Sequence, residues 1–141
     1  MFNLNNINHV LNINDLSFLI GPILNAGGRL GKSNYASNLL SSNNKRFINA
    51  KSNELVAMNN KRKKIEKLII DEIDFKKLEK DNKNVIIYYS PNINEGLIGI
   101  IASRLKDYFN KPSIVITNSN NFLKGSARSM NYYNIGNKKK K

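Results

Sequence analysis

The chain has 141 residues, of which 40% are hydrophobic, so it has enough apolar sequence for one ordinary domain, or for one domain and part of another. It contains no cysteine, which excludes disulfides and thiolate metal sites. The formal net charge is +13, from 23 Lys and Arg residues against 10 Asp and Glu residues, and this excess favours a polyanionic partner, nucleic acid before an anionic membrane.

The first part of the sequence predicts two short helices joined by a glycine-rich loop. The helices would cover residues 16–20 and 34–40, because a capping side chain precedes each apolar run and a helix breaker follows it. Residues 23–31 would form the loop. The candidate caps and breakers are Asn14 or Asp15, Gly21, Pro22, Ser33 and the cluster at residues 41–44.

Residues 44–73 predict a single long helix, because apolar residues recur there mostly at three- and four-residue steps. The apolar residues are Ile48, Leu55, Met58, Ile65, Leu68, Ile69 and Ile73. Residues 61–64, together with Lys67, would cover the other faces with positive charge, and a solvated face is the simplest explanation of such a run. At 1.5 Å per residue the helix would be about 45 Å long, which suits a connector between two lobes.

The last part predicts a small lobe of strands and one helix. Residues 76–84 would be a charged link, and residues 85–89 a buried strand, since they are β-branched and aromatic. A helix over residues 96–109 and a strand over residues 113–117 would complete a βαβ unit with parallel strands. A third strand would start at residues 122–124 and lead into a glycine-serine-arginine loop at residues 124–129.

The predicted fold class is therefore α/β: short helices and a long connector helix, followed by a small α/β lobe with a βαβ unit and a third strand. The predicted division is residues 1–43, a connector helix and link over residues 44–84, and an α/β domain over residues 85–141 that looks cut short. No run approaches the roughly 18 apolar residues of a membrane span, and no secretory signal opens the sequence, so we expect a cytoplasmic protein with no membrane partner.

Two glycine- and arginine-containing segments have the composition of an anion site. In residues 124–129, Gly125 would let the backbone approach a ligand, the two serines would donate hydroxyl groups, and the planar fork of Arg128 would match two phosphate oxygens. In residues 21–31, Asn25 and Arg29 are the polar side chains long enough to reach a ligand. A surface hairpin and a helix-breaking linker explain the same residues without a ligand.

Taken together, these segments resemble the RecJ family of single-stranded-DNA-specific exonucleases, in the DHH phosphoesterase superfamily. The blocks that carry the resemblance are Gly-Pro-x-x-Asn-Ala-x-Gly-Arg-Leu-Gly at 21–31, the basic helix, Glu-Gly-Leu-Ile-Gly-Ile-Ile-Ala-Ser-Arg-Leu at 95–105, and Lys-Gly-Ser-Ala-Arg-Ser at 124–129. The resemblance implies that residues 15–40 end the catalytic DHH domain and that residues 85–136 form most of the DHH-associated domain.

The resemblance also implies 5′-to-3′ cleavage of single-stranded DNA with manganese or magnesium. The family's metal ligands belong to aspartate and Asp-His-His motifs upstream of these blocks. This sequence has no Asp-His-His and one histidine, His9, while seven of its ten carboxylates lie between Glu54 and Asp81, where pairing with lysine is the simpler role. We therefore expect no catalytic residue and no metal site in this chain, and a metal only in the full-length family member.

What the resemblance carries over is a pocket for the 5′-terminal phosphate of DNA. It assigns that pocket to Arg29, Ser126 and Arg128, which would meet around one anion, and it places Lys63 near a glutamine that faces the same cleft in relatives. The complete predicted set is Arg29, Ser126, Arg128, Asn25, Gly125, Lys124 and Lys63. Two positions depart from the family: Gly27 replaces a usual alanine, from which we expect a small loosening of the packing, and Asn94 replaces a usual histidine.

The expected partners are single-stranded DNA and a missing N-terminal DHH domain packed on residues 15–40, in a monomer. Tyr132 and Tyr133 are candidate base-stacking residues. One alternative is a DHH-family phosphoesterase that acts on small oligonucleotides, although those relatives usually end in a Gly-Gly-His type of loop. The other is a non-catalytic basic protein that binds nucleic acid.

Overall fold

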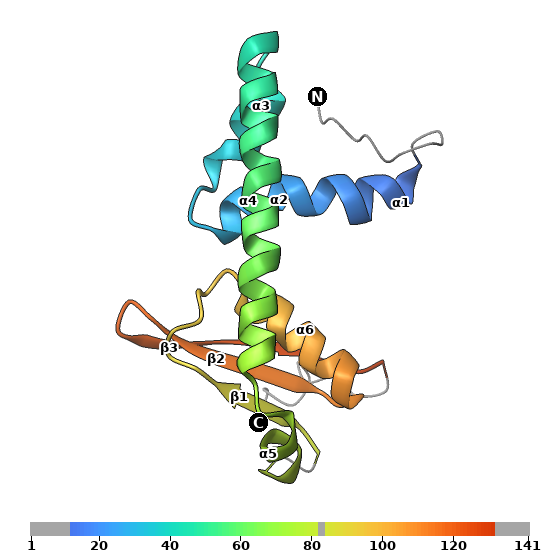
Figure 1. Cartoon of the computed structure of the whole chain (residues 1–141), viewed down its shortest axis with the longest axis vertical. Helices are drawn as coiled ribbons and strands as arrows, with labels where there is room; N and C mark the ends of the chain where they lie inside the picture. Colours follow the sequence, from blue (N-terminus) through green and yellow to red (C-terminus); the bar gives the residue numbers. More distant parts are fainter. Residues whose placement is uncertain (1–11, 82–83, 132–141) are drawn as a thin grey trace, which may run out of the picture. The chain divides into compact units, whose positions relative to one another are not determined.

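The computed structural model of the chain describes residues 12–81 and 84–131 (Figure 1). The chain divides into two compact units, residues 1–65 and residues 66–141. The first unit is helical, and the second holds the sheet. The three-part division predicted from the sequence stays a prediction.

The first unit begins with three helical segments that follow one another without a break: α1 (Ile13–Asp15), the π-helical turn η1 (Leu16–Ile20) and α2 (Gly21–Arg29). The prediction that Gly21 and Pro22 stop a helix was wrong, as was the predicted loop at residues 23–31. Pro22 cannot donate a helical hydrogen bond. The wide π turn ends two residues before Pro22, and the helix passes the proline instead of ending there.

The cap of this helix is Asn12 and not the predicted Asn14 or Asp15. The Asn12 side-chain oxygen accepts from the backbone N–H groups of Asn14 at 2.8 Å and of Asp15 at 3.1 Å. The Asp15 carboxylate accepts from the Asn12 backbone N–H at 2.9 Å in return. This reciprocal pair is a capping box, which satisfies backbone donors that a helix start leaves open.

Two further helices complete the first unit: α3 (Asn34–Ser41) and the first part of α4 (Lys45–Glu72). Ser33 precedes α3 as predicted, but its side chain makes no capping bond. Asn44 does cap α4, since its side-chain oxygen accepts from the N–H groups of Arg46 and Phe47 at 3.0 and 3.2 Å. The predicted long helix is confirmed to within one residue at each end.

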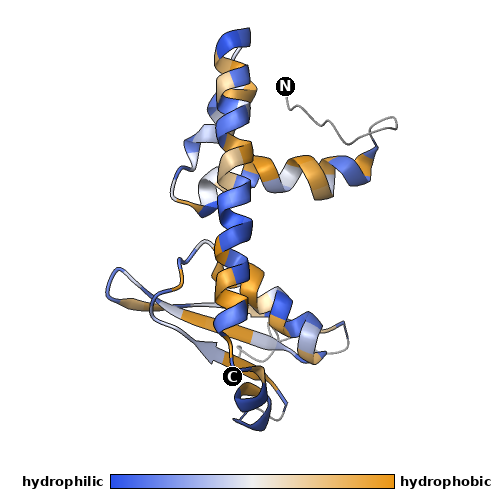
Figure 2. Cartoon of the chain, in the orientation of Figure 1, coloured by the Kyte–Doolittle hydropathy of each residue, from blue (hydrophilic) through white to orange (hydrophobic). Residues whose placement is uncertain are grey.

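The core of the first unit joins α2, α3 and α4. Its buried residues are Ile23, Leu39 and Leu55, one from each helix, and the partly buried residues packed on them are Leu24, Tyr35, Ile48, Val56 and Met58. In Figure 2 the helix formed by η1 and α2 is largely hydrophobic. Gly27 belongs to this contact: a Cβ there would lie 2.7 Å from the Lys32 carbonyl oxygen. Gly27 is thus tightly packed, and the loosening expected from the lost alanine methyl is not what the structure shows.

The second unit contains α5 (Phe75–Asp81), β1 (Ile86–Tyr89), α6 (Ile98–Phe109), β2 (Ser113–Ser119) and β3 (Phe122–Arg128). The strand order is β1-β2-β3, with β1 parallel and β3 antiparallel to β2. The α/β fold class, the βαβ unit and the third strand are confirmed. The predicted charged link is largely the helix α5, capped by the Asp74 carboxylate, which accepts from the Lys77 N–H at 3.0 Å.

Helix α6 packs on one face of the sheet (Figure 1). Its residues Ile101 and Leu105 are fully buried, as are Ile86 of β1 and Val115 of β2. The two-residue turn between β2 and β3 is made by Asn120 and Asn121, which both have positive φ angles of the kind a tight hairpin requires. Asparagine tolerates these angles better than most residues do.

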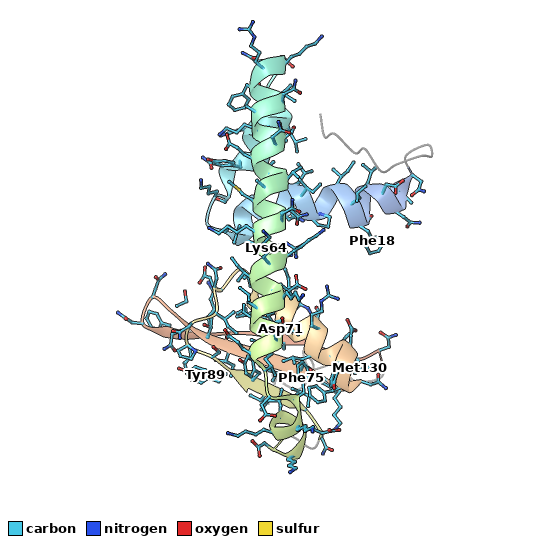
Figure 3. The ribbon with its side chains drawn as sticks, in the orientation of Figure 1. Phe18, Lys64, Asp71, Phe75, Tyr89 and Met130 are labelled. Carbon is cyan, nitrogen blue, oxygen red and sulfur yellow. The ribbon has the colours of Figure 1, made fainter. Side chains whose placement is uncertain are left out.

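The other face of the sheet is apolar and open to solvent in the described part of the chain. Alternate residues of a strand point to opposite faces, and the register places Ile87, Tyr89 and Leu123 opposite to the buried set. These three side chains are 48%, 52% and 70% exposed. Figure 3 shows the Tyr89 side chain at this sheet.

The packing of α3 can be tested with two neighbouring leucines. Leu39 is fully buried in the core of the first unit, whereas Leu40 is 61% exposed. We expect Leu39→Ala to lower the free energy of unfolding by about 2–5 kcal/mol, because it leaves a cavity. The matched control Leu40→Ala should change it by no more than about 0.5 kcal/mol. Urea denaturation followed by circular dichroism measures both, and equal losses would contradict this core.

Candidate functional site

The segment predicted to form a glycine-serine-arginine loop belongs to strand β3. Residues 124–128 pair antiparallel with β2, with Ser126 opposite Val115 and Gly125 opposite Ile116. The prediction of a loop was wrong because β2 supplies a hydrogen-bonding partner that the local sequence does not reveal. Strand alternation places Lys124, Ser126 and Arg128 on the face that α6 covers.

Arg128 is held in place by hydrogen bonds to α6 and β3. Its Nε donates to the Ser103 hydroxyl at 3.0 Å. Its Nη1 donates to the Ser126 hydroxyl at 3.3 Å and to the Ala127 carbonyl at 2.9 Å. The structure thus brings together two of the predicted phosphate-binding residues, Ser126 and Arg128.

Two residues that the sequence did not single out complete this arrangement: Gly99 and Ser103. The guanidinium of Arg128 lies across Gly99, where a Cβ would be 2.8 Å from Nη2 and 3.2 Å from the Ser126 hydroxyl oxygen. Ser103 lies one turn further along α6, and its hydroxyl donates to the Gly99 carbonyl at 3.1 Å. The sequence did contain a signal for them. Gly99 is small, Ser103 carries a hydroxyl, and residues four positions apart lie on the same face of a helix.

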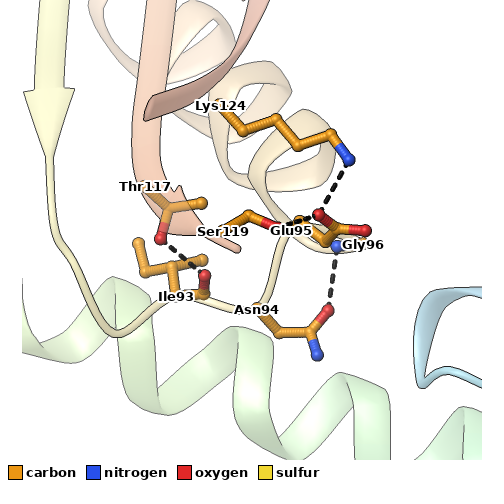
Figure 4. Close-up of polar contacts among 7 residues, drawn as sticks. All are labelled: Ile93, Asn94, Glu95, Gly96, Thr117, Ser119 and Lys124. Carbon is orange, nitrogen blue, oxygen red and sulfur yellow. Dashed lines mark hydrogen bonds and ion pairs between the residues drawn. The ribbon is translucent and has the colours of Figure 1, made fainter. Parts of the chain in front are cut away.

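Lys124 forms an ion pair with Glu95. Its Nζ lies 2.7 Å from Oε2 of Glu95, and the Ser119 hydroxyl donates to the same oxygen (Figure 4). The hydrogen bond from Lys124, followed by that from Ser119, lowers the pKa of the Glu95 carboxyl below its usual value. All three side chains are at least partly open to water, so the pair contributes little to stability. The predicted phosphate contact of Lys124 stays a prediction.

The loop before α6 is fastened to the β2–β3 hairpin by further polar contacts. Besides the Glu95 pair, the Thr117 hydroxyl donates to the Ile93 carbonyl at 2.7 Å, a bond that is buried. Asn94 accepts from the Gly96 N–H at 2.8 Å through its side-chain oxygen (Figure 4). Asn94 therefore has a local role in shaping the start of α6.

Three further predicted residues, Arg29, Asn25 and Lys63, lie in the first unit. Arg29 is the last residue of α2 and is partly buried, while Asn25 is exposed on the same helix. Lys63 is exposed on α4, but its neighbour Arg62 is largely buried and donates from Nε to the Asn59 side chain at 3.1 Å. That finding corrects the expectation that residues 61–64 all form a solvated face. The shared anion between Arg29 and Arg128 stays a prediction.

Gly125 has no steric requirement to be glycine. A Cβ there would make ordinary contacts of 3.7 Å with Ile116 Cγ1 and the Val115 carbonyl oxygen. Its predicted role in bringing the backbone close to a ligand is not tested by this. The predicted stacking residues Tyr132 and Tyr133 lie outside the described residues, as do His9 and the lysines at 138–141.

The curated relatives of the chain are single-stranded-DNA-specific exonucleases named RecJ. The chain is 37% identical to the Escherichia coli (strain K12) protein and 38% identical to the Haemophilus influenzae protein, over 122 residues in each case. Each match covers 82% of this chain and 21% of the relative. The Bacillus subtilis (strain 168) relative is 32% identical over 123 residues, which is 85% of this chain and 16% of the relative. No family model matches the chain.

Solved RecJ structures also share its fold. RecJ from Thermus thermophilus in complex with Mn²⁺ gives a TM-score of 0.72 at 26% identity, over 83% of this chain and 17% of that one. A further RecJ exonuclease bound to manganese gives 0.68 at 25% identity, over 88% of this chain and 31% of that one. This chain is RecJ-like. It spans about a fifth of the length of the first curated relatives it matches.

The RecJ structures named above contain manganese, but the described part of the RecJ-like chain has no cluster of side chains that could bind it. Within residues 12–81 and 84–131, no three His, Cys, Asp or Glu side chains gather closely enough to hold an ion. The donors in these ranges therefore do not fit the metal, and no cleavage step is assigned to them. In the same ranges, no helix has the length and apolar character needed to cross a membrane.

The ion pair between Glu95 and Lys124 should have a measurable effect on the pKa of the Glu95 carboxyl. We expect the Glu95 carboxyl to titrate below the usual pKa of glutamate, and Lys124→Met to raise this pKa toward the usual value. Because the folded-state pKa is lowered, any stability from the pair is present above the unfolded-state pKa and is lost as pH falls through the lowered pKa.

Side-chain carboxyl NMR over an acid titration measures this pKa. Lys106→Met is the control, because Lys106 pairs with Asp107 and not with Glu95. A Glu95 pKa that does not respond to Lys124→Met would show that the ion pair does not form in solution.

Proposed function

We propose that this chain contributes a DNA-binding part of a RecJ-like exonuclease that degrades single-stranded DNA from its 5′ end. Arg128 and Ser126 would contact the 5′-terminal phosphate. The observation that carries the proposal is the Arg128 guanidinium, which is fixed beside Ser126 over the first turn of α6.

The chemistry of this position suits a phosphate. Arginine donates charge-assisted hydrogen bonds to phosphate oxygens, and Ser126 adds a hydroxyl. Gly99 is the second residue of α6, and a helix carries a partial positive charge over its first turn. The formal net charge of +13 adds a long-range attraction for the DNA backbone.

The hydrogen bonds of Arg128 support a choice of which guanidinium nitrogen would donate to a ligand. Arginine has five N–H donors, and in Arg128 the Nε donor and Nη1 are already directed to Ser103, Ser126 and Ala127. The hydrogen bonds that Arg128 makes among residues 12–81 and 84–131 start from Nε and Nη1, and none starts from Nη2. The sequence predicted that the planar guanidinium of Arg128 would bind two phosphate oxygens. We propose instead that only Nη2 donates to the phosphate.

The parts that cleavage requires would lie elsewhere in a longer RecJ-like protein. We propose that a DHH domain packs over the first helices, as the exposed apolar side chains there suggest: Ile13, Leu16, Phe18 and Leu19. Figure 3 labels Phe18. Manganese or magnesium would be bound by that domain. Such an assembly would act in the cytoplasm on single-stranded DNA.

Replacing Arg128 tests the phosphate contact. We expect Arg128→Ala to weaken binding of a 5′-phosphorylated oligonucleotide by about 1.5–3 kcal/mol, the range of a hydrogen bond to a charged group. Binding of the same oligonucleotide with a 5′-hydroxyl should fall much less. Fluorescence anisotropy with both oligonucleotides at one fixed salt concentration measures the two dissociation constants.

The control for this experiment is Arg46→Ala, which removes one positive charge from an exposed site on α4. It should weaken both oligonucleotides to the same small extent. Equal losses on the two oligonucleotides for Arg128→Ala would reject the terminal-phosphate role and favour a non-specific basic nucleic-acid-binding protein.

A further inference from the structure

We infer that Gly99 and Ser103 of α6 are positioning residues that set the orientation of the Arg128 guanidinium, so that its Nη2 end faces the bound anion. The inference rests on the proposed function, because it explains how the phosphate-binding arginine is aimed. Neither residue would itself need to touch the DNA.

Ser103 supplies a directional contact. A serine hydroxyl has one proton, and that of Ser103 is donated to the Gly99 carbonyl at 3.1 Å. The hydroxyl oxygen can then act only as an acceptor toward Arg128, whose Nε lies 3.0 Å away. The helix backbone thus fixes the hydroxyl, and the hydroxyl fixes the Nε edge of the guanidinium.

Gly99 supplies the space in which the guanidinium lies. A Cβ at this position would be 2.8 Å from Nη2 and 3.6 Å from Cζ of Arg128. The contact below 3.0 Å is with the end of a flexible side chain, so a methyl group would displace the guanidinium and leave the backbone in place. Gly99 lies inside a helix without a positive φ angle, so an alanine is not strained there and is the better helix former.

These two contacts lead to a prediction that distinguishes an effect on the orientation of the Arg128 guanidinium from an effect on the stability of the fold. Gly99→Ala should leave the fold as stable as before, or more stable, and still impair phosphate recognition. A residue whose only role is structural would behave in the opposite way, because its replacement would lower stability first.

The test compares variants of the 141-residue chain by the ratio of its dissociation constants for 5′-hydroxyl and 5′-phosphorylated forms of one oligonucleotide. We expect Gly99→Ala and Ser103→Ala each to lower this ratio about three- to tenfold, the range expected when one hydrogen bond is lost. Ser103→Thr should restore the ratio, since threonine offers the same hydroxyl. Thermal melting should show no loss of stability in Gly99→Ala.

Ser37→Ala is the matched control. Ser37 also donates its hydroxyl to a carbonyl of its own helix, that of Asn34 at 3.0 Å, but it lies on α3 in the first unit. The ratio should not change in this variant. If it falls as far as in Ser103→Ala, loss of a helical serine explains the effect and the inference is wrong.

The remaining outcomes separate the inference from the proposed function. If Arg128→Ala abolishes the preference for the 5′-phosphate while Gly99→Ala and Ser103→Ala keep it, the phosphate site stands and the positioning role is wrong. If Arg128→Ala leaves the preference unchanged, both are wrong. A lowered melting temperature in Gly99→Ala, in proportion to the lost preference, would also overturn the positioning role.

Discussion

The antiparallel pairing of β3 with β2 determines where the predicted binding residues of the second unit lie. Its register places Ser126 opposite Val115 and Arg128 opposite Ser113. Val115 and Ser113, the two residues of β2, are both buried. Because side chains alternate along a strand, a shift of one residue would move Arg128 to the opposite face. The Asn120–Asn121 turn fixes this register, since a two-residue loop leaves little freedom in pairing. Because of that pairing, Arg128 and Ser126 lie together on the face of the sheet that α6 covers.

Much of the fold could be predicted from the sequence, because its strongest signals are periodic. The long helix and the βαβ unit followed from apolar spacing and β-branched runs, and both are confirmed. The helix across Pro22 could not be predicted, because a proline normally ends a helix and the π turn that accommodates it has no local signal. Helix α5 was predicted as a link, since its seven residues are mostly charged and too few to show a helical period.

The candidate site was only partly predictable, for a related reason. Composition and the family resemblance pointed to Ser126 and Arg128, and the structure brings these two within hydrogen-bonding distance. Gly99 and Ser103 were not singled out, because their contact with Arg128 depends on how α6 packs on β3, which spacing along the chain does not encode. The Glu95 partner of Lys124 is 29 residues away in sequence and was missed for the same reason.

The apolar face of the sheet that is exposed in the described part of the chain affects the physical behaviour of the protein. Ile87, Tyr89 and Leu123 form a surface that two copies could bury against each other, and the outer strands of the described sheet, β1 and β3, present edges at which strands of another copy could add. Mutual repulsion between chains of high positive charge opposes such association. Dissolved ions screen that repulsion, so the colloidal solubility of the chain should be highest in dilute buffer and should decrease as ionic strength rises.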